Sequence, residues 1–181
     1  MKERCIIGID PGSNGGIAIK AGDEKTKVVK MPKDITSLTD LLEYYRDNYE
    51  PIVFLEKLSV RPDDITKGGN MGKLYRIQRM MAGYEHLKAI IEVSGVPYVM
   101  VHPMTWQSKL ELRTIGVHEE KAERKRRYQE VAAKLYKEVK VTLWNADALL
   151  IMTFGRYALE NMPKWIKANL PEREQNKIRL I

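Results

Sequence analysis

Three acidic residues stand in apolar surroundings, far apart along the chain. Asp10 closes the run CIIGID, Glu56 follows VFL, and Asp147 lies within NADALLI. An ionised carboxylate among apolar neighbours is costly unless a positive charge compensates it. Mg²⁺ does so well, because it prefers a few carboxylates together with water and phosphate oxygens. Taken together, the three acids favour a metal site.

Each acid also has a simpler interpretation. Asp10 begins Asp-Pro-Gly, a good turn sequence, and Asp147 could stabilise a helix N-terminus. Glu56 could be half of a salt bridge. For each acid taken singly, the simpler interpretation has at least as much support as a role as metal ligand. The glycine-rich stretch 11–16 allows a tight hairpin with its backbone close to a ligand, a feature of more than one superfamily.

The elements that must position these acids follow from hydrophobic patterning. Strands are expected at 5–10, 17–20, 27–31, 51–57 and 97–102. Helices are expected at 36–48 with Thr36 as the cap, and at 73–94, 104–112, 118–139 and 145–160. The stretch 59–72 reads as a loop, because it holds a proline and several glycines and no apolar period.

This element order predicts an α/β domain over residues 1–160. Its mixed five-stranded sheet would combine an antiparallel N-terminal meander with parallel strands, and helices would cover both faces. Asp10 and Glu56 then end strands, where functional groups gather in α/β sheets, and Asp147 lies in the first turn of the last helix. Residues 161–181 form a C-terminal extension, either a docking arm or partly disordered.

The net charge of +7 and the pI of about 9.4 indicate a polyanionic partner. Nucleic acid is the commonest such partner, and a merely basic protein is the alternative. No apolar run is long enough to span a membrane, and the N-terminus lacks the pattern of a signal peptide. Together with the single Cys5, this predicts a cytoplasmic protein without a membrane partner.

Four motifs resemble those of a known family. The segment IIGIDPGSNGGIAI closely resembles the first motif of RuvC-type Holliday junction resolvases, particularly their phage-encoded relatives, and FLEK resembles their second acidic motif. HPMTWQSKLEL is similar to their strand-to-helix segment, and NADALLI followed by FGRY to their last motif. Motif order and spacing agree over residues 4–157.

The resemblance implies an RNase H-like fold and a homodimer that places paired, symmetric nicks in a four-way DNA junction. The products would carry 5′-phosphate and 3′-hydroxyl ends. Asp10, Glu56 and Asp147 match the family's catalytic acids one for one. The resemblance also implies two Mg²⁺ ions per site, bridged by Asp10, with Mn²⁺ expected to substitute. A small-molecule substrate is not expected.

The chain departs from the family at one position. The family usually has a fourth acid, or a histidine, a few residues before the last aspartate, whereas residues 142–145 read TLWN. Asn145 could supply a neutral oxygen as a metal ligand instead. Otherwise the second ion binds weakly, or the activity is reduced.

DNA recognition should rest on phosphates and shape. The candidate contacts are Arg61, Lys67, Lys73, Tyr75, Arg76, Lys109, Lys121, Arg124, Lys125 and Arg127. Tyr75 could stack on an unpaired base or pack at a helix start. Lys125 and Lys109 could steady charge in catalysis, but for the basic run around Lys125 a solvated helix face or a plain phosphate contact is favoured over a catalytic role. The loop 59–72 could enter the junction centre.

The expected helix 73–94 has apolar residues on more than one side. Met80 and Ile90 flank its main apolar stripe, and a two-fold partner would cover the excess. A helix buried entirely within its own domain is the alternative.

Three other functions fit parts of the pattern. Actin- and sugar-kinase-like ATPases begin with a similar strand and hairpin, but they need two such domains, and this length suits one. A branched-DNA binder with a decayed site fits the missing acid. A nuclease acting on flaps or replication forks would share the same fold and acids.

Overall fold

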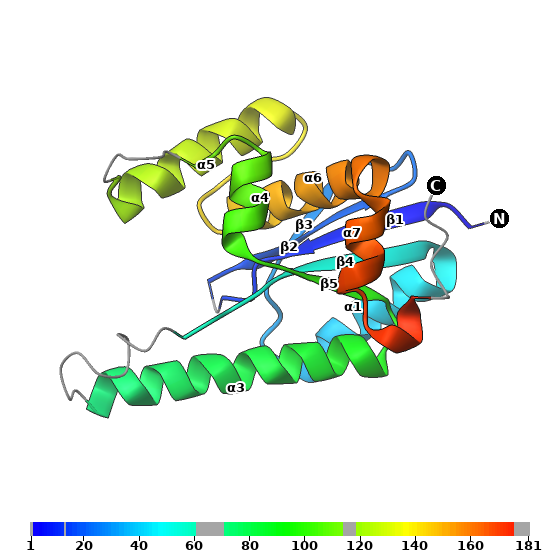
Figure 1. Ribbon diagram of the computed structural model, residues 1–181, viewed down its shortest axis with the longest axis horizontal. Helices are drawn as coiled ribbons and strands as arrows, with labels where there is room; N and C mark the ends of the chain where they lie inside the picture. Colours follow the sequence, from blue (N-terminus) through cyan, green and yellow to red (C-terminus); the bar gives the residue numbers. More distant parts are fainter. Residues whose placement is uncertain (1, 13, 61–70, 114–118, 176–181) are drawn as a thin grey trace.

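A computed structural model describes residues 2–12, 14–60, 71–113 and 119–175 (Figure 1). Its centre is one five-stranded sheet in the order β3-β2-β1-β4-β5. The strands are β1 (Arg4–Ile9), β2 (Gly16–Ala21), β3 (Lys27–Lys30), β4 (Glu50–Glu56) and β5 (Tyr98–Val101). The first three pair antiparallel, whereas β1 with β4 and β4 with β5 pair parallel. The predicted mixed sheet is confirmed.

Helices cover both faces of this sheet, as predicted (Figure 1). One face carries α1 (Ile35–Asn48) and α3 (Met71–Val93). The other carries α4 (Pro103–Lys109), α5 (Lys121–Leu135), α6 (Ala146–Asn161) and α7 (Pro163–Asn169), after which a short 3₁₀ turn spans Glu172–Glu174. Among the described residues, every helix is too short or too polar to cross a membrane.

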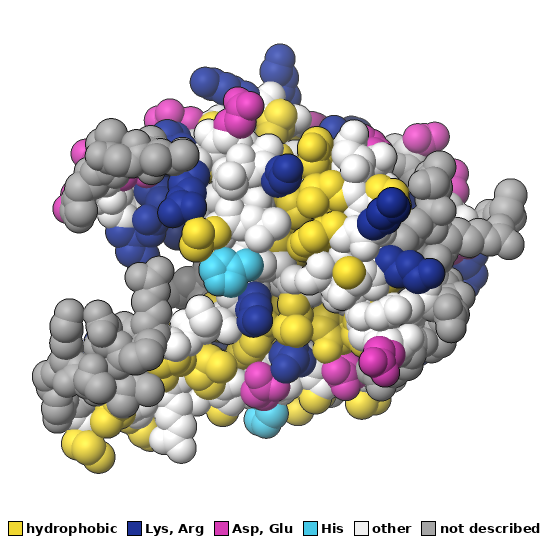
Figure 2. All heavy atoms as spheres, in the orientation of Figure 1, with side chains coloured by type: hydrophobic (Ala, Val, Ile, Leu, Met, Phe, Trp, Pro, Cys, Tyr) yellow, Lys and Arg dark blue, Asp and Glu magenta, His cyan; other side chains and the backbone are white. Residues whose placement is uncertain are grey.

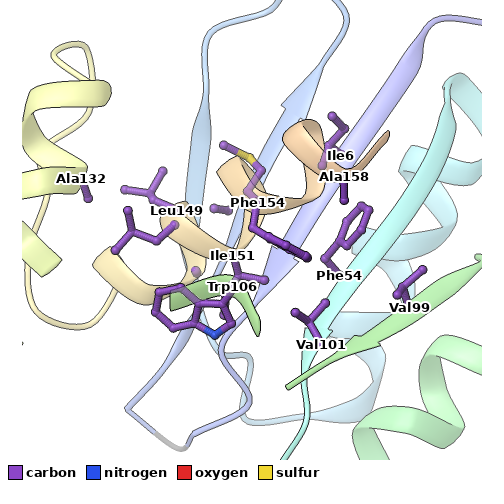
Figure 3. Close-up of a cluster of buried hydrophobic side chains, with 14 of the residues drawn as sticks. Ile6, Phe54, Val99, Val101, Trp106, Ala132, Leu149, Ile151, Phe154 and Ala158 are labelled. Atoms are coloured by element: carbon purple, nitrogen blue, oxygen red, sulfur yellow. The ribbon is translucent and has the colours of Figure 1, made fainter. Parts of the chain in front are cut away.

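Alternation along the strands divides the core into two layers. On β4, Val53 and Leu55 face α1 and α3, whereas Ile52 and Phe54 face α6. Figure 3 shows the second layer, in which Phe54 and Phe154 meet edge to face with ring centroids 6.4 Å apart. Strands buried on both faces are what near-continuous apolar runs predict.

Two expectations about helix starts are wrong. Thr36 does not cap α1, because the cap is Asp34, whose carboxylate accepts from the Ser37 N–H at 2.7 Å. Helix α3 begins at Met71, so the last two residues of the expected loop 59–72 are helical, and residues 61–70 lie outside the described residues.

The apolar residues of α3 divide along its length. Tyr84, Leu87 and Ile91 are buried in the core, but the earlier members of the same stripe are only partly covered. Met71, Tyr75 and Met80 are exposed. The described residues therefore leave the N-terminal half of α3 incompletely covered, and its covering by a two-fold partner stays a prediction.

Part of the expected C-terminal extension packs on the core. Ile166 of α7 is buried, and the ring of Trp165 meets that of Phe154 edge to face at 5.5 Å. The division of the chain at residue 160 stays a prediction, and residues 176–181 lie outside the described residues.

Candidate active site

Asp10 and Glu56 lie side by side at one edge of the sheet. Glu56 is the last residue of β4, and Asp10 directly follows β1. These strands run parallel with Ile9 opposite Leu55, so the next residue of each strand comes to the same level. The Gly12 N–H donates to Asp10 Oδ1 at 3.3 Å, which ties this carboxylate to the hairpin. The structure thus places both acids where parallel strands end, as the sequence predicted.

Asp147 reaches this edge because α6 lies directly against β1. A Cβ on Gly8 would come within 2.4 Å of the Ala148 carbonyl oxygen and 2.5 Å of the Met152 nitrogen. Only glycine therefore permits the helix backbone to approach the strand so closely. Asp147 is the second residue of α6, in its first turn as predicted, and its side chain is buried.

Two of the three acids, Asp10 and Glu56, have raised pKa values. Burial, then the charge of Asp10, raises the pKa of Glu56 from 4.5 to about 7, and the charge of Asp147 adds to the rise. Burial, then the charge of Asp147, also raises the pKa of Asp10. Buried carboxylates whose pKa is raised by nearby like charges are typical of functional sites.

Lys125 is a basic residue that contacts one of these acids. Its ammonium group donates to Asp147 Oδ2, linking α5 to α6. Lys125 therefore contacts one of the acids, while a catalytic role or a phosphate contact for it stays a prediction. The other oxygen, Asp147 Oδ1, is buried and has no hydrogen-bond partner among the described residues.

The donor set suits a hard divalent cation, which binds carboxylate oxygens and satisfies buried ones. An orphaned buried oxygen beside two further carboxylates of raised pKa fits this chemistry. The side chains are not preassembled, however. Among the described residues, no three His, Cys, Asp or Glu side chains converge closely enough to hold one ion.

Trp106 is a site residue that the sequence analysis missed. Its indole Nε1–H donates to Glu56 Oε1 at 3.0 Å. The tryptophan lies on α4, fifty residues after its acceptor, and is fully buried. Its segment resembled a family motif, but spacing alone gave no sign of this contact.

Just before Asp147, the side chain of Asn145 forms hydrogen bonds to the backbone. Asn145 is buried, its side-chain oxygen accepts from the Thr142 N–H at 2.8 Å, and its amide donates to the Lys140 carbonyl at 3.1 Å. This amide holds the turn into α6, which gives no support to the predicted role of Asn145 as a metal ligand. Trp144 lies against Gly16 at the start of β2, where a Cβ would come within 2.8 Å of its ring.

Figure 2 shows Lys and Arg side chains gathered over the first half of α5. In Figure 1 the ends of β1 and β4 point to this side of the molecule. Lys121 is exposed there and Arg124 is half-buried. Arg127 instead forms a two-pronged ion pair with Glu119, with both hydrogen bonds 2.8 Å long.

The remaining DNA-contact candidates are dispersed. Lys109 is exposed at the end of α4. Lys73, Tyr75 and Arg76 lie on the first turns of α3, and Tyr75 is 59% exposed, so it does not pack into the core of its own chain. Two candidates lie outside the described residues, namely Arg61 and Lys67.

The sequence matches no protein-family model and no curated protein. A solved structure of Thermus thermophilus RuvC in complex with a Holliday junction substrate is 18% identical, with a TM-score of 0.51, and the match covers 87% of this chain and 96% of that chain. Another T. thermophilus RuvC structure is 20% identical, with a TM-score of 0.49 over 85% of this chain and 95% of that chain. At such identity the likeness concerns the fold. The RNase H-like α/β fold predicted from the sequence is thereby confirmed.

Proposed function

We propose that this protein is a Mg²⁺-dependent endonuclease that resolves four-way DNA junctions by paired, symmetric nicks. The observation that carries the proposal is the gathering of Asp10, Glu56 and Asp147 at one edge of the sheet, from β1, β4 and α6. The fold likeness to a RuvC that was solved with a Holliday junction supports the choice of substrate. The phage-like branch of that family is the proposed affiliation.

The three carboxylates would hold Mg²⁺, or Mn²⁺ in its place. Bound ions would polarise the scissile phosphate and lower the pKa of a water molecule, giving 5′-phosphate and 3′-hydroxyl ends. Asp147 would contribute its unpartnered Oδ1, and Asp10 would contribute from a hairpin that already orients it. Lys125 would balance the carboxylate charge through Asp147 Oδ2 and lie within reach of a phosphate.

DNA would be bound by the basic side of α5, and a second copy of the chain would dimerise through α3. The apolar residues in the N-terminal half of α3 support this dimer, because Met71, Tyr75 and Met80 are exposed and Ile77 is only partly covered by the described part of the chain. A two-fold dimer would direct two active sites at two opposed strands, as paired nicks require.

The decisive experiment compares labelled substrates. Four-way junction, linear duplex, flap and RNA–DNA hybrid are incubated with the protein in Mg²⁺ or in EDTA. We expect symmetric nicks in the junction alone and only with Mg²⁺. Asp10→Asn should abolish cleavage while junction binding persists, and Asp23→Asn, which changes an exposed acid in the β2–β3 turn, should leave both unchanged.

Other outcomes would identify the rival functions. Equal cleavage of flaps would indicate a nuclease for other branched DNA. Junction binding without cleavage, unaffected by Asp10→Asn, would indicate a branched-DNA binder. ATP hydrolysis would indicate a kinase-like ATPase and would contradict the proposal.

A further inference from the structure

We infer that Trp106 is a positioning residue for Glu56, holding one carboxylate oxygen so that the other is presented to the metal ion. This inference rests on the proposed function. The observation behind it is the 3.0 Å hydrogen bond from Trp106 Nε1 to Glu56 Oε1. An indole offers a single N–H donor and no acceptor, so the contact engages one oxygen of the carboxylate.

The donor is itself rigidly held. Helix α4 has Pro103 in its first turn, and the His102 ring nitrogen accepts from the Met104 N–H at 3.3 Å. Trp106 is 0% exposed, and its ring meets that of Tyr128 edge to face at 5.5 Å. Figure 3 shows it in the cluster with Val101 and Ile151. A ring packed in this way cannot turn its N–H elsewhere without disturbing the core.

Fixing the carboxylate on folding should favour ion binding. A free glutamate loses rotamer freedom when it is ordered around an ion. The indole has already restricted that freedom in the folded chain, so less is lost when the ion binds. Residues that hydrogen-bond a metal's ligands act in this way, and their loss costs about 10- to 100-fold in metal affinity or activity.

The packing around Trp106 also connects to Asp147, a second acid of the site. Tyr128 and Lys125 are three residues apart on α5 and so lie on one side of that helix. Lys125 holds Asp147, while Trp106 holds Glu56 and packs on Tyr128.

The simpler alternative is that Trp106 is a core residue whose N–H donates to the nearest acceptor and has no part in metal binding. The two interpretations differ in whether metal affinity depends on the N–H.

The test replaces only that N–H. Trp106 is exchanged for β-(3-benzothienyl)alanine, an isostere in which sulfur stands in place of the N–H, and Trp106→Phe provides a genetically encoded second variant. Mn²⁺ binding to the DNA-free protein is measured by electron paramagnetic resonance. We expect the isostere to bind Mn²⁺ about 10- to 100-fold more weakly. Junction cleavage by this variant should recover at saturating Mg²⁺.

Phe154→Leu is the matched packing control, because it removes a buried aromatic side chain from the same core layer, outside the contacts of Trp106 with Glu56 and Tyr128, and leaves the N–H in place. It should lower thermal stability and leave Mn²⁺ affinity close to that of the wild type. The contact itself is checked by the three indole ¹H–¹⁵N resonances that the three tryptophans provide, of which that of Trp106 should move in Glu56→Gln.

Two outcomes would overturn the inference, and they are distinguishable. If the wild type binds Mn²⁺ and cleaves junctions, and the isostere binds Mn²⁺ equally well, then Trp106 is a core residue and the proposed function stands. If the wild type binds no Mn²⁺ and cleaves no junction, both the inference and the proposed function fail.

Discussion

Lys125 donates its ammonium N–H to Asp147 Oδ2, joining the basic helix α5 to the acid at the start of α6. The side chain of Asp147 is 7% exposed, so its charge has little access to water. Without a metal ion, this lysine provides the nearest compensation for a carboxylate whose other oxygen has no partner among the described residues. We therefore expect both Lys125 and a bound metal ion to stabilise the negative charge of Asp147.

The first prediction concerns Lys125→Met. In EDTA this variant should lose about 1–2 kcal/mol of unfolding free energy, because it leaves a nearly buried carboxylate without its cation. Saturating Mg²⁺ should reduce the difference from the wild type. Urea denaturation with and without Mg²⁺ measures both values. Arg126→Met, which removes an exposed charge from the same helix, is the control. Equal losses in the two variants would contradict the argument.

The second prediction concerns pH and Glu56. Burial and the charge of Asp10 raise its pKa to about 7, above the 4.5 of the unfolded chain. Between these values the folded protein keeps a proton that the unfolded chain releases, so this residue makes the fold less stable as the pH rises from 4.5 through 7.

Glu56→Gln should remove that penalty. In EDTA at pH 8 the variant should be more stable than the wild type by about 3 kcal/mol, which corresponds to about 6–12 °C in melting temperature. At pH 4.5 and below the two melting temperatures should converge. Glu50→Gln, an exposed change at the other end of β4, should show no such divergence. Parallel melting curves at all pH values would contradict the assigned pKa.

The acids of this site could be predicted because local patterns place them. Apolar runs end at Asp10 and Glu56, and parallel strands bring such ends together. What fixes Asp147 could not be predicted, because the close approach of α6 to Gly8 depends on packing between distant segments. The bond from Trp106 to Glu56 spans fifty residues and carries no periodic signal.

Short polar side chains near helix starts were also ambiguous in the sequence. Asp34 and Thr36 are both acceptable caps, and only the backbone conformation shows that Asp34 holds the Ser37 N–H. Likewise Asn145 could bind a metal or the backbone, and the structure shows the backbone bonds.

The third prediction tests the close approach of α6 to β1. Gly8→Ala would push a methyl group to within 2.4 Å of the Ala148 carbonyl oxygen, so the helix that carries Asp147 must shift. We expect a loss of about 1–3 kcal/mol in unfolding free energy, measured by urea denaturation. The control is Gly83→Ala in α3, where nothing lies within 4 Å of the added methyl group and a small gain is expected. If Gly8→Ala leaves the free energy of unfolding unchanged, then α6 can shift away from β1 without loss of stability.

The fourth prediction tests the proposed dimer. Ile77→Asp places a charge among the partly covered apolar residues of α3 and should convert the dimer to a monomer in light scattering coupled to gel filtration. Val93→Asp, at the exposed end of the same helix, should leave the dimer intact. A wild-type monomer at micromolar concentration would contradict the proposed dimer, and a dimer that survives Ile77→Asp would place the interface elsewhere.

The fifth prediction tests the basic side chains at the start of α5. Lys121 begins α5 on the side where β1 and β4 end, whereas Lys134 lies near the end of that helix, away from those strand ends (Figure 1). Lys121→Gln should weaken junction binding and reduce the slope of log affinity against log salt by about one, as expected when one phosphate contact is lost. Lys134→Gln removes the same charge and should change the slope little. Binding isotherms at several KCl concentrations give both slopes, and equal slopes would mean that net charge alone, rather than this surface, attracts the DNA.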